Sequence, residues 1–579
     1  MNKKVMNKKV MNKKVMNKKV MKKKKAAALI SALCLAILIT GCSGKSQKPS
    51  DSNGKPNSAT ESASGSKASS GKEIKVSDPN EFPIVTNPVT LTAWTGKREH
   101  ISDPKTNTMI TEYEKKTGVH IKWTFVPGEE YSTQLNLSFA GGEYPDMYLT
   151  NLTPEQVQTA TESKILLPLN DLIESQGTNT KKVLEENPEY KEYLTSHDGN
   201  IYTLMETDVG VHMRNTHKMF LYNDWLQKLG GKVPETTGEF RDYLIQIRDK
   251  DLNGNGKKDE IPMISFGAEG DPVPYIMDSF QMTGDNYYYI DDSGKLVFAP
   301  ITDDWKEGLR YLNDLYQEGL FYAEETYTQD GDSLKALVNK KKGEDFLVGA
   351  VPSFFQGRFI DTGVLNWTDY VPIGPLKGPS GHQAVPDNGI VFRLCSAISS
   401  QCKYPEVAMK WLDYWTGEEG TFANAYGMKK GVNYEMVDKP AFSGADQSVK
   451  VLQNSYSDNF RFGENMVPKV DSEKIRYAVT DDESTYNTNN TFILMQAARM
   501  YESYYQSLNI PSIVWSDKET ISKMTEDSGL FNDYIKRANT EFILGTRSLD
   551  KDWDAYLKEL KDMGLKDYLT VLRKYYGAK

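Results

Sequence analysis

From residue 88 onward, the spacing of hydrophobic and polar positions predicts short strands and helices in turn. Residues 89–94 form an apolar run suited to a strand, and residues 119–125 alternate apolar and polar side chains with the period of two that a strand requires. Residues 107–116 and 131–140 carry helical patterns, and residues 147–149 form a third strand-like run. Strands and helices that alternate with short links indicate βαβ units and a mostly parallel sheet.

The carboxyl ends of these predicted strands carry aromatic and polar side chains. Trp94 ends the first strand, and Tyr148 and Asn151 lie at the end of the third. Ligands of open α/β sheets bind beyond the carboxyl ends of the strands. The pattern therefore predicts that these three residues contact a ligand, with core packing as the competing interpretation for each of them.

A different apolar pattern lies near the start of the chain. Residues 22–25 are lysines, and residues 26–39 contain no charged side chain. A basic start followed by a short apolar stretch is typical of an export signal, and this stretch is shorter than the roughly 20 residues that a membrane span needs. No second long apolar run follows in the sequence, so residues 1–41 are interpreted as a signal peptide.

The end of this signal, Ile39-Thr40-Gly41-Cys42, resembles a bacterial lipobox. The resemblance implies that Cys42 becomes the mature N-terminus and carries diacylglycerol on its thioether, with a further acyl chain such as palmitate in some bacteria. Two acyl chains anchor a protein stably, whereas one chain does not. Ordinary secretion with an incidental cysteine is the alternative interpretation.

The signal is preceded by a short repeat and followed by a polar segment. Residues 1–20 repeat Met-Asn-Lys-Lys-Val, which either lengthens the basic region or precedes a true start at Met21. We favour Met21, because residues 21–41 already form a complete signal. Residues 42–82 are interpreted as a lipidated, disordered tether, since residues 43–72 contain no large apolar side chain. A Gly/Ser-rich tether of about 30 residues has an r.m.s. reach of roughly 30 Å.

Length and charge limit the remaining possibilities. A chain of 579 residues is too long for one hydrophobic core, so two lobes are expected. The net charge is −9, and residues 1–41 contribute 12 Lys and no acidic side chain, so the mature chain carries −21. So acidic a protein argues against nucleic acid or an anionic lipid surface as its partner. Cys395 and Cys402 could form a disulfide or stay reduced, and the sequence leaves both possibilities open.

Five stretches resemble, in the same order along the chain, the sequence signatures of family 1 extracellular solute-binding proteins. They are residues 141–147, which include a Gly-x-x-Pro-Asp turn, residues 198–204, 220–230 and 404–415, and the closing residues 542–545 with 553–576. Met205 stands where the second signature usually has proline. The resemblance extends from about residue 88 to the C-terminus.

This resemblance implies an α/β, periplasmic-binding-protein-like fold. In that fold, two α/β lobes are joined by a hinge and close on a ligand cleft between them. By analogy, we expect residues 83–207 and 390–480 to form the first lobe, and residues 208–389 and 481–579 to form the second.

The resemblance also implies a function. It predicts a lipid-anchored substrate-binding protein of an ABC importer, a monomer at the extracytoplasmic face of the cell membrane, which captures an oligosaccharide by lobe closure and delivers it to permease subunits. The sequence contains no Gly-x-Ser-x-Gly, His-Glu-x-x-His or Walker motif, so no catalytic residues are expected. The alternatives are a membrane-tethered exported polysaccharide lyase or hydrolase, and a sugar-sensing accessory lipoprotein for a membrane kinase.

Residues 251–262 follow the logic of an EF-hand calcium loop. Side-chain oxygens occupy loop positions one, three, five and nine, and a glycine occupies position six, although Pro262 replaces the usual Glu at position twelve. Similar loops bind calcium in oligosaccharide-binding members of the family that the chain resembles. The expected Ca²⁺ ligands are Asp251, Asn253, Asn255, the carbonyl of Lys257, Asp259 and Glu260. A Gly/Asn-rich turn with solvated carboxylates is the alternative.

Sugar-binding pockets combine aromatic rings with amide, carboxylate and Arg groups. Residues 267–275 are expected to form a loop at the rim of the cleft, and Phe354-Phe355 follows an apparent strand. The predicted ligand-binding residues are Trp94, Tyr148, Asn151, Arg214, Asp271, Tyr275, Phe354, Phe355, Trp367, Asn388 and Tyr426. Four tryptophans in helical patterns are assigned to core packing instead: Trp225, Trp411, Trp415 and Trp553.

Overall fold

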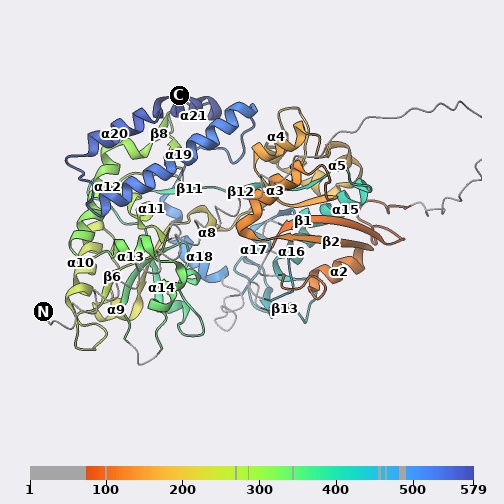
Figure 1. Ribbon diagram of the computed structural model, residues 1–579. Helices are drawn as coiled ribbons and strands as arrows, with labels where there is room; N and C mark the ends of the chain where they lie inside the picture. The colour runs from red at the N-terminus through yellow and green to blue at the C-terminus, as the bar shows by residue number, and fades with distance from the viewer. Residues whose placement is uncertain are drawn as a thin grey trace, which may run out of the picture. The chain divides into compact units, whose positions relative to one another are not determined.

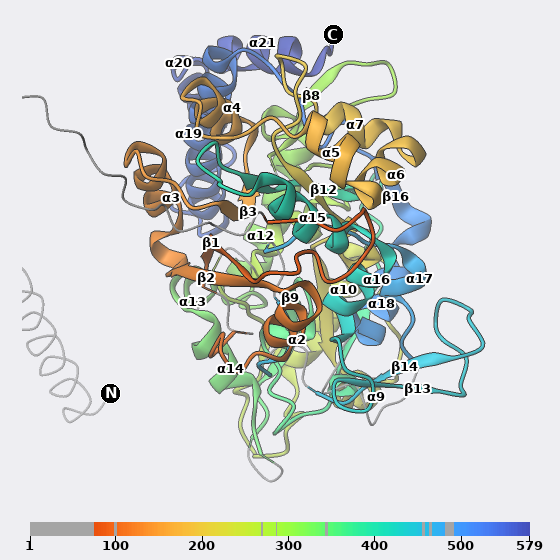
Figure 2. The same cartoon turned by 90° about the vertical axis from the view of Figure 1, so that its right-hand side faces the viewer.

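The computed structural model describes residues 74–97, 101–267, 270–284, 286–341, 345–453, 458–462, 466–480 and 491–579. The predicted signal peptide, Cys42 and the tether up to residue 73 lie outside these residues. Within the described part of the chain, helices cover two larger β-sheets (Figure 1, Figure 2). None of the described helices combines the length and the apolar character that crossing a membrane requires.

The first sheet has six strands in the order β15-β4-β12-β3-β1-β2. Their bounds are Val89–Gly96 (β1), Val119–Val126 (β2), Met147–Leu152 (β3), Leu204–Asp208 (β4), Val391–Ile398 (β12) and Lys469–Val470 (β15). β1 is parallel to β2 and β3, and β15 is parallel to β4, whereas β12 is antiparallel to both of its neighbours. The prediction of a parallel sheet is confirmed for β1 to β3, and β12 departs from it because its chain returns from the second sheet.

The predicted elements at the start of this sheet are confirmed. The helical patterns correspond to α2 (Thr108–Thr117) and α3 (Tyr131–Ala140). The side chain of Asn107 begins α2 by accepting a hydrogen bond from the backbone N–H of Ile110 at 3.1 Å. Gly118 ends it at φ +73°, where a Cβ would lie 2.8 Å from the carbonyl oxygen of Val85, so glycine is required there.

Further helices cover the first sheet. They are α4 (Pro154–Glu162), α5 (Asn170–Gln176), α6 (Thr178–Glu186), α7 (Pro188–Leu194), α15 (Pro405–Thr416), α16 (Glu418–Tyr426) and α17 (Glu473–Arg476). α5, α6 and α15 lie side by side (Figure 2). Trp411 and Trp415 of α15 are 1% and 0% exposed, which confirms their assignment to the core.

The second sheet has four strands in the order β10-β5-β9-β6. Their bounds are Lys218–Tyr222 (β5), Ile261–Met263 (β6), Val348–Ser353 (β9) and Tyr370–Ile373 (β10). β5 is antiparallel to β9 and β10, and β6 is parallel to β9. The strand expected before Phe354 is therefore present as β9.

The helices of the second sheet are α9 (Asn223–Lys228), α10 (Thr237–Asp249), α11 (Pro272–Met277), α12 (Asp303–Gln317), α13 (Ala323–Thr328), α14 (Gly331–Val338), α19 (Lys518–Ile543), α20 (Trp553–Asp562) and α21 (Leu565–Tyr576). α19 packs along α12, and α21 packs on α19 (Figure 1). Trp225 of α9 and Trp553 of α20 are buried in the core, as predicted. The expectation that residues 267–275 form only a loop is wrong, because α11 begins at Pro272.

The remaining elements lie at the edges of the two sheets and at the crossovers between them. They are the strand pairs β7 (Tyr288–Ile290) with β8 (Leu296–Phe298), β11 (Val385–Asp387) with β16 (Tyr505–Ser507) and β13 (Tyr434–Val437) with β14 (Ser448–Val451), and the helices α8 (Val211–Arg214) and α18 (Thr491–Arg499). α8 lies in the crossover from β4 to β5, and residues 388–390 form the return crossover from β11 to β12.

Each larger sheet has its own hydrophobic core. One core draws its buried side chains from residues 84–205 and 392–467, and the other from residues 219–385 and 497–572. Each core therefore combines segments that are distant in the sequence, as the two crossovers require.

The packed chain begins before residue 83, where the predicted tether ends. The side-chain nitrogen of Lys410, on α15, donates to the carbonyl oxygen of Ser77 at 3.0 Å and to its hydroxyl at 2.6 Å. The ring of Phe82 packs edge-on against Tyr414 with the ring centroids 5.8 Å apart. Residues 77–82 thus pack against α15 rather than belonging to a disordered tether.

Asp413 joins two helices of the first core. The first turn of α6 has no cap from its own residues, and the Asp413 carboxylate of α15 accepts from the backbone N–H groups of Asn179 at 3.0 Å and Thr180 at 2.7 Å. The Thr180 hydroxyl donates to the same carboxylate at 2.6 Å. Asp413 therefore caps α6 from a neighbouring helix.

Asp413→Ala should lower the free energy of unfolding by about 2–3 kcal/mol, because it leaves buried N–H groups at the start of α6 without an acceptor. Urea denaturation followed by circular dichroism measures the change. Glu406→Ala, at an exposed carboxylate on the same helix, is the matched control and should change the stability by less than about 0.5 kcal/mol. Equal losses in the two variants would contradict the capping role.

Candidate ligand-binding site

Three aromatic rings gather where the carboxyl-terminal half of β1 lies beside the start of β3. Tyr148 is the second residue of β3, so its predicted position at the carboxyl end of that strand is wrong, because β3 extends to Leu152. The ring centroid of Trp94 lies 5.4 Å from that of Tyr131 and 6.1 Å from that of Tyr148. The Tyr131 hydroxyl contacts the hydroxyl of Thr150 and donates to the carbonyl oxygen of Asn151 at 3.1 Å. We call Trp94, Tyr131, Tyr148, Thr150 and Asn151 the strand-end cluster, and it combines aromatic faces with hydroxyl and amide groups.

The members of this cluster differ in burial. Tyr148 is fully buried, and burial raises the pKa of its hydroxyl to about 12, against a hydrogen bond with Ser138 that lowers it. Trp94 is 6% exposed, whereas Tyr131 and Asn151 are half-buried. Tyr148 is therefore the buried member of the cluster, whereas Tyr131 and Asn151 expose more of their surface to solvent.

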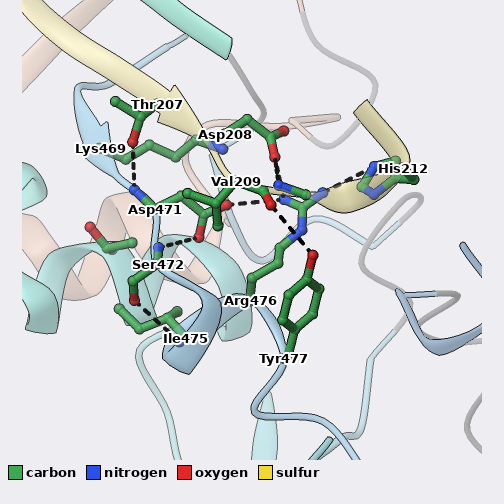
Figure 3. A network of polar contacts seen from close by, with 12 residues as sticks. Thr207, Asp208, Val209, His212, Lys469, Asp471, Ser472, Ile475, Arg476 and Tyr477 are labelled. Atoms are coloured by element: carbon green, nitrogen blue, oxygen red, sulfur yellow. Dashed lines mark hydrogen bonds and ion pairs between the residues drawn. The ribbon is translucent and has the colours of Figure 1, made fainter. Parts of the chain in front are cut away.

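A second polar group lies where the chain leaves the first sheet (Figure 3). The guanidinium of Arg476 lies 3.6 Å from the Asp208 carboxylate and 3.4 Å from that of Asp471, and it contacts Nε2 of His212 at 3.2 Å. The backbone N–H of Asp471 donates to the hydroxyl of Thr207 at 3.0 Å. We call Asp208, His212, Asp471 and Arg476 the crossover network.

The electrostatics of the crossover network follow from burial and from Arg476. Burial is the largest influence and disfavours ionised Asp208, but Arg476, Lys469 and the backbone N–H of Gly210 together outweigh it and hold the pKa of Asp208 below its ordinary range. Burial, reinforced by Arg476, holds the pKa of His212 well below its ordinary value, so His212 is neutral near pH 7. Nε2 of His212 therefore accepts a hydrogen bond from Arg476, because a guanidinium can only donate.

An aromatic pair from the second sheet meets this network. Phe354 and Phe355 follow β9 and contact each other edge-to-face with centroids 5.5 Å apart. The ring of Phe354 lies 5.8 Å from that of His212, and the side-chain nitrogen of Lys218 lies 5.5 Å from the Phe354 centroid. Lys218 is 1% exposed, and burial lowers its pKa to about 7. The structure therefore brings residues of both sheets together at the first crossover.

Arg214 and Asn388, two of the predicted ligand-binding residues, lie close together. Arg214 is in the first crossover and Asn388 is in the return crossover. Arg214 forms a bidentate ion pair with Asp387, with Nε 2.8 Å from Oδ1, and its guanidinium lies 4.9 Å from the centroid of Tyr505. The backbone N–H of Asn388 donates to the carbonyl oxygen of Arg214 at 3.0 Å. These contacts join α8, β11 and β16, so Arg214 has a demonstrable structural role at this position.

The other predicted ligand-binding residues lie elsewhere. Asp271 caps α11 by accepting from Val273 N–H at 3.0 Å, and burial raises its pKa to about 6. Tyr275 is fully buried, and its hydroxyl donates to the carbonyl oxygen of Gly374 at 2.8 Å. The structure does not bring either residue to the strand-end cluster or to the crossover network.

Trp367 and Tyr426 are also separate from these two groups. Trp367 precedes β10 and lies near α9, at the end of the second sheet opposite to Lys218. Tyr426 is 2% exposed in a small apolar cluster, and its hydroxyl donates to the carbonyl oxygen of Ile475 at 2.7 Å. Neither residue therefore lies with the strand-end cluster or the crossover network.

Sequence reasoning did not select Tyr131, Asp208, His212 or Arg476. Tyr131 lies at the start of α3, a few residues after the predicted strand 119–125, and this position could have indicated it. No sequence signal was available for the crossover network, because His212 and Arg476 are 264 positions apart.

A cavity of about 660 Å³ lies at the return crossover. Its lining includes five aromatic residues: Tyr190 and Tyr193 of α7, Phe392 of β12, Tyr288 and Tyr576. Among the predicted ligand-binding residues, only Asn388 lines this cavity. It is therefore distinct from the strand-end cluster and from the crossover network.

The 251–260 loop is closed by its own hydrogen bonds. The Asp251 carboxylate accepts from the N–H groups of Gly254 and Gly256, both at 2.8 Å, and these glycines have φ near +77°. The Asp259 carboxylate accepts from the side-chain amides of Asn253 at 3.2 Å and Asn255 at 3.1 Å. Side-chain oxygens and carboxylates thus concentrate on one short loop.

Glu260 gives this loop a feature that suits a hard cation. Its Oε1 accepts from the backbone N–H of Leu252 at 2.7 Å, whereas its Oε2 is buried without a hydrogen-bond partner. An all-oxygen donor set with an unsatisfied carboxylate oxygen fits Ca²⁺ or Mg²⁺ rather than zinc. Within the described ranges, no three His, Cys, Asp or Glu side chains converge on one point, so amide and carbonyl oxygens would have to complete the ligand set.

Comparison with known protein families shows what the chain is related to. A family model for bacterial extracellular solute-binding proteins matches residues 99–422. The chain is 28% identical over 492 residues to the fructooligosaccharide ABC transporter substrate-binding protein FusA of Streptococcus pneumoniae, covering 82% of this chain and 87% of FusA. It is 23% identical over 472 residues to lipoprotein LipO of Bacillus subtilis, covering 80% and 88%.

Solved structures share the fold. FusA in complex with kestose matches with a TM-score of 0.70 and 27% identity, covering 84% of this chain and 99% of that one, and an EF-hand mutant of FusA with fructo-nystose matches equally well, at 0.70 and 26%. An HMO-binding, ABC-transporter-associated solute-binding protein from Bifidobacterium longum infantis matches with a TM-score of 0.71 at 20% identity, covering 85% and 99%. The predicted periplasmic-binding-protein-like fold of two α/β lobes is confirmed. The family is one of binding proteins, not enzymes, and the chain belongs to the bacterial extracellular solute-binding proteins.

Proposed function

We propose that this chain is the substrate-binding protein of an ABC importer and captures an oligosaccharide outside the cell. The observation that carries the proposal is the similarity to FusA, which extends over 82% of the chain and is accompanied by the same fold. The chain would work with permease subunits as a monomer, and ATP hydrolysis on the other side of the membrane would drive transport.

The ligand surface that we propose combines two groups of residues. The strand-end cluster supplies Trp94, Tyr131 and Asn151 from the first sheet, and Phe354 and Phe355 come from the second. Sugars present apolar C–H faces and hydroxyls, which suit aromatic rings and amides respectively. A ligand that contacts both groups binds the closed state better than the open state, and this difference in affinity drives closure.

The proposed lobes are residues 83–207 with 390–480 and residues 208–389 with 481–579. The two separate cores support this division, because their buried side chains fall on opposite sides of these boundaries. Rotation of the lobes would then occur at the two crossovers.

Kestose and nystose are the first ligands to test, and either should raise the melting temperature, since a ligand that binds only the folded state stabilises it. Phe355→Ala should weaken binding about tenfold, because a half-buried aromatic platform contributes more than 1 kcal/mol. Isothermal titration calorimetry measures both effects. Trp367→Ala is the matched control, at an aromatic residue remote from both groups, and should leave affinity within about twofold.

A screen in which no oligosaccharide shifts the melting temperature, while peptides do, would overturn the proposed ligand class. Loss of affinity in the Trp367 variant but not in the Phe355 variant would instead place the site at the opposite end of the second sheet.

We also propose that residues 251–260 bind a structural Ca²⁺ ion. The unsatisfied, buried Oε2 of Glu260 and the oxygen-rich loop support this assignment, as does the EF-hand of FusA. Asp251, Asn253, Asn255, the Lys257 carbonyl, Asp259 and Glu260 would hold the ion. Its role would be to neutralise the carboxylates and tie β6 to the preceding helix α10.

EGTA should therefore lower the melting temperature of the purified protein, and Ca²⁺ should restore it whereas equimolar Mg²⁺ should not. At a free Ca²⁺ concentration of 100 times Kd, the ion contributes about 2.7 kcal/mol. Differential scanning calorimetry follows the effect. Asp259→Asn should abolish the response to Ca²⁺, and Asp438→Asn, at an exposed carboxylate elsewhere, should retain it. Equal rescue by both metals would contradict a calcium site.

Finally, we propose that Cys42 anchors the protein to the extracytoplasmic face of the cell membrane. The lipobox-like sequence and the similarity to lipoprotein LipO support this proposal. Cys42→Ser should move the protein from the membrane fraction to the soluble fraction, because it removes the thiol that carries the diacylglycerol. Immunoblotting of cell fractions measures the shift, and full retention in the membrane would refute the anchor.

A further inference from the structure

Phe354 contacts His212, on α8 of the first crossover, and Lys218, at the start of β5. The His212 ring lies against it with a centroid distance of 5.8 Å and an interplanar angle of 47°. The side-chain nitrogen of Lys218 lies 5.5 Å from its centroid. The position of this aromatic ring, which belongs to the second sheet, therefore depends on side chains of α8 and β5.

His212 in turn is tied to the first sheet. It is 5% exposed, and its Nε2 lies 3.2 Å from Nη2 of Arg476. Arg476 is held by Asp208 of β4 and by Asp471, as the dashed contacts of Figure 3 show. A continuous set of contacts thus extends from β4, through Arg476 and His212, to Phe354.

The α8 backbone around His212 is also fixed. The Tyr477 hydroxyl accepts from the backbone N–H of Val211 at 2.8 Å and donates to the carbonyl oxygen of Val209 at 3.4 Å. Gly210 allows the tight approach, since a Cβ there would lie 2.6 Å from Cε1 of His212. His212 therefore has little freedom to move away from Arg476 without a change in the backbone.

We propose that His212 is a positioning residue for ligand binding: in its neutral form it holds Phe354 in place relative to the first sheet, and its protonation releases Phe354 and weakens binding. This inference rests on the proposed function, because it takes Phe354 as part of the ligand surface. The neutral imidazole of His212 offers both an acceptor atom to Arg476 and a flat face to Phe354.

The direction of the pH effect follows from the charges that face His212. They are Asp208 on β4, Arg476 on α17, Lys218 on β5 and Lys469 on β15. A protonated imidazole could no longer accept from Arg476 and would place a second positive charge 3.2 Å from it, with only Asp208 favouring the added proton. Burial and Arg476 hold the pKa of His212 below its ordinary value, so the neutral, positioning form dominates at pH 7 and is lost as pH falls.

A ligand-free measurement tests the contact itself. The variant chain carries 4-fluorophenylalanine at position 354, and ¹⁹F NMR follows its resonance from pH 7.5 to pH 4.5. The resonance should shift with one protonation step, and His212→Gln should remove that step, because glutamine keeps an acceptor for Arg476 but does not titrate in this range. His197→Gln, at an exposed histidine, should leave the step unchanged. A resonance that ignores both pH and the His212 substitution overturns the inference.

A binding measurement tests the consequence. Kestose affinity of the unaltered protein should fall by up to about tenfold for each pH unit below the pKa of His212, the slope of a single linked proton. H212Q should show a flatter pH dependence of kestose affinity than the unaltered protein, whereas H212A should bind more weakly than the unaltered protein at pH 7.5, because Phe354 loses its support, and should approach it as pH falls.

The two arms separate the possible failures. If Phe354→Ala weakens kestose binding while H212Q and H212A leave its affinity and pH dependence unchanged, His212 has no positioning role. If Phe354→Ala leaves binding unchanged, or kestose does not bind at all, the proposed ligand surface fails, and the fluorine resonance alone decides whether His212 holds Phe354.

Discussion

The described fold depends most on how charge is buried where the chain leaves the first sheet. Asp208 and Asp471 are 5% and 8% exposed, and both lie against the guanidinium of Arg476. A buried ion costs several kcal/mol unless a partner of opposite charge compensates it. Because Arg476 serves both carboxylates, the end of β4 and the segment that leads into α17 have to meet at this point, and the first crossover can leave the sheet in one direction only.

This constraint explains why residues from two separate cores meet at one place. The backbone of α8 is fixed by Tyr477, and the end of α8 is fixed by the Arg214–Asp387 ion pair. The crossovers are thus cross-linked to each other as well as to the first sheet. A lobe that moves about such crossovers moves as a unit.

Local patterns in the sequence were sufficient to predict the first three strands and the helices between them. Their signals come from neighbouring residues, such as the alternation in residues 119–125 and the glycine that ends α2. The antiparallel course of β12 was not predictable in this way, because a strand buried on both faces has no direction in its hydrophobic pattern. Residue type alone was also a poor guide to which tyrosines bind a ligand. Tyr275 and Tyr426 suit a sugar site by chemistry, yet each buries its ring and satisfies its hydroxyl within a core.

The pairing of charges near the crossovers bears on the kind of ligand that suits this protein. Arg476 faces two carboxylates, Lys469 lies 3.4 Å from Glu206, and Arg214 is bound by Asp387. Lys218 lacks a carboxylate within ion-pair distance among the described residues, but burial lowers its pKa to about 7 and so reduces its charge. An anionic ligand would have to compete with carboxylates that already hold these cations, and it would approach a chain of formal net charge −9. A neutral ligand rich in hydroxyl groups avoids both costs, since it needs only aromatic faces and hydrogen-bonding groups such as those of the strand-end cluster. The electrostatics of the crossovers therefore favour a neutral oligosaccharide on grounds that are independent of sequence similarity.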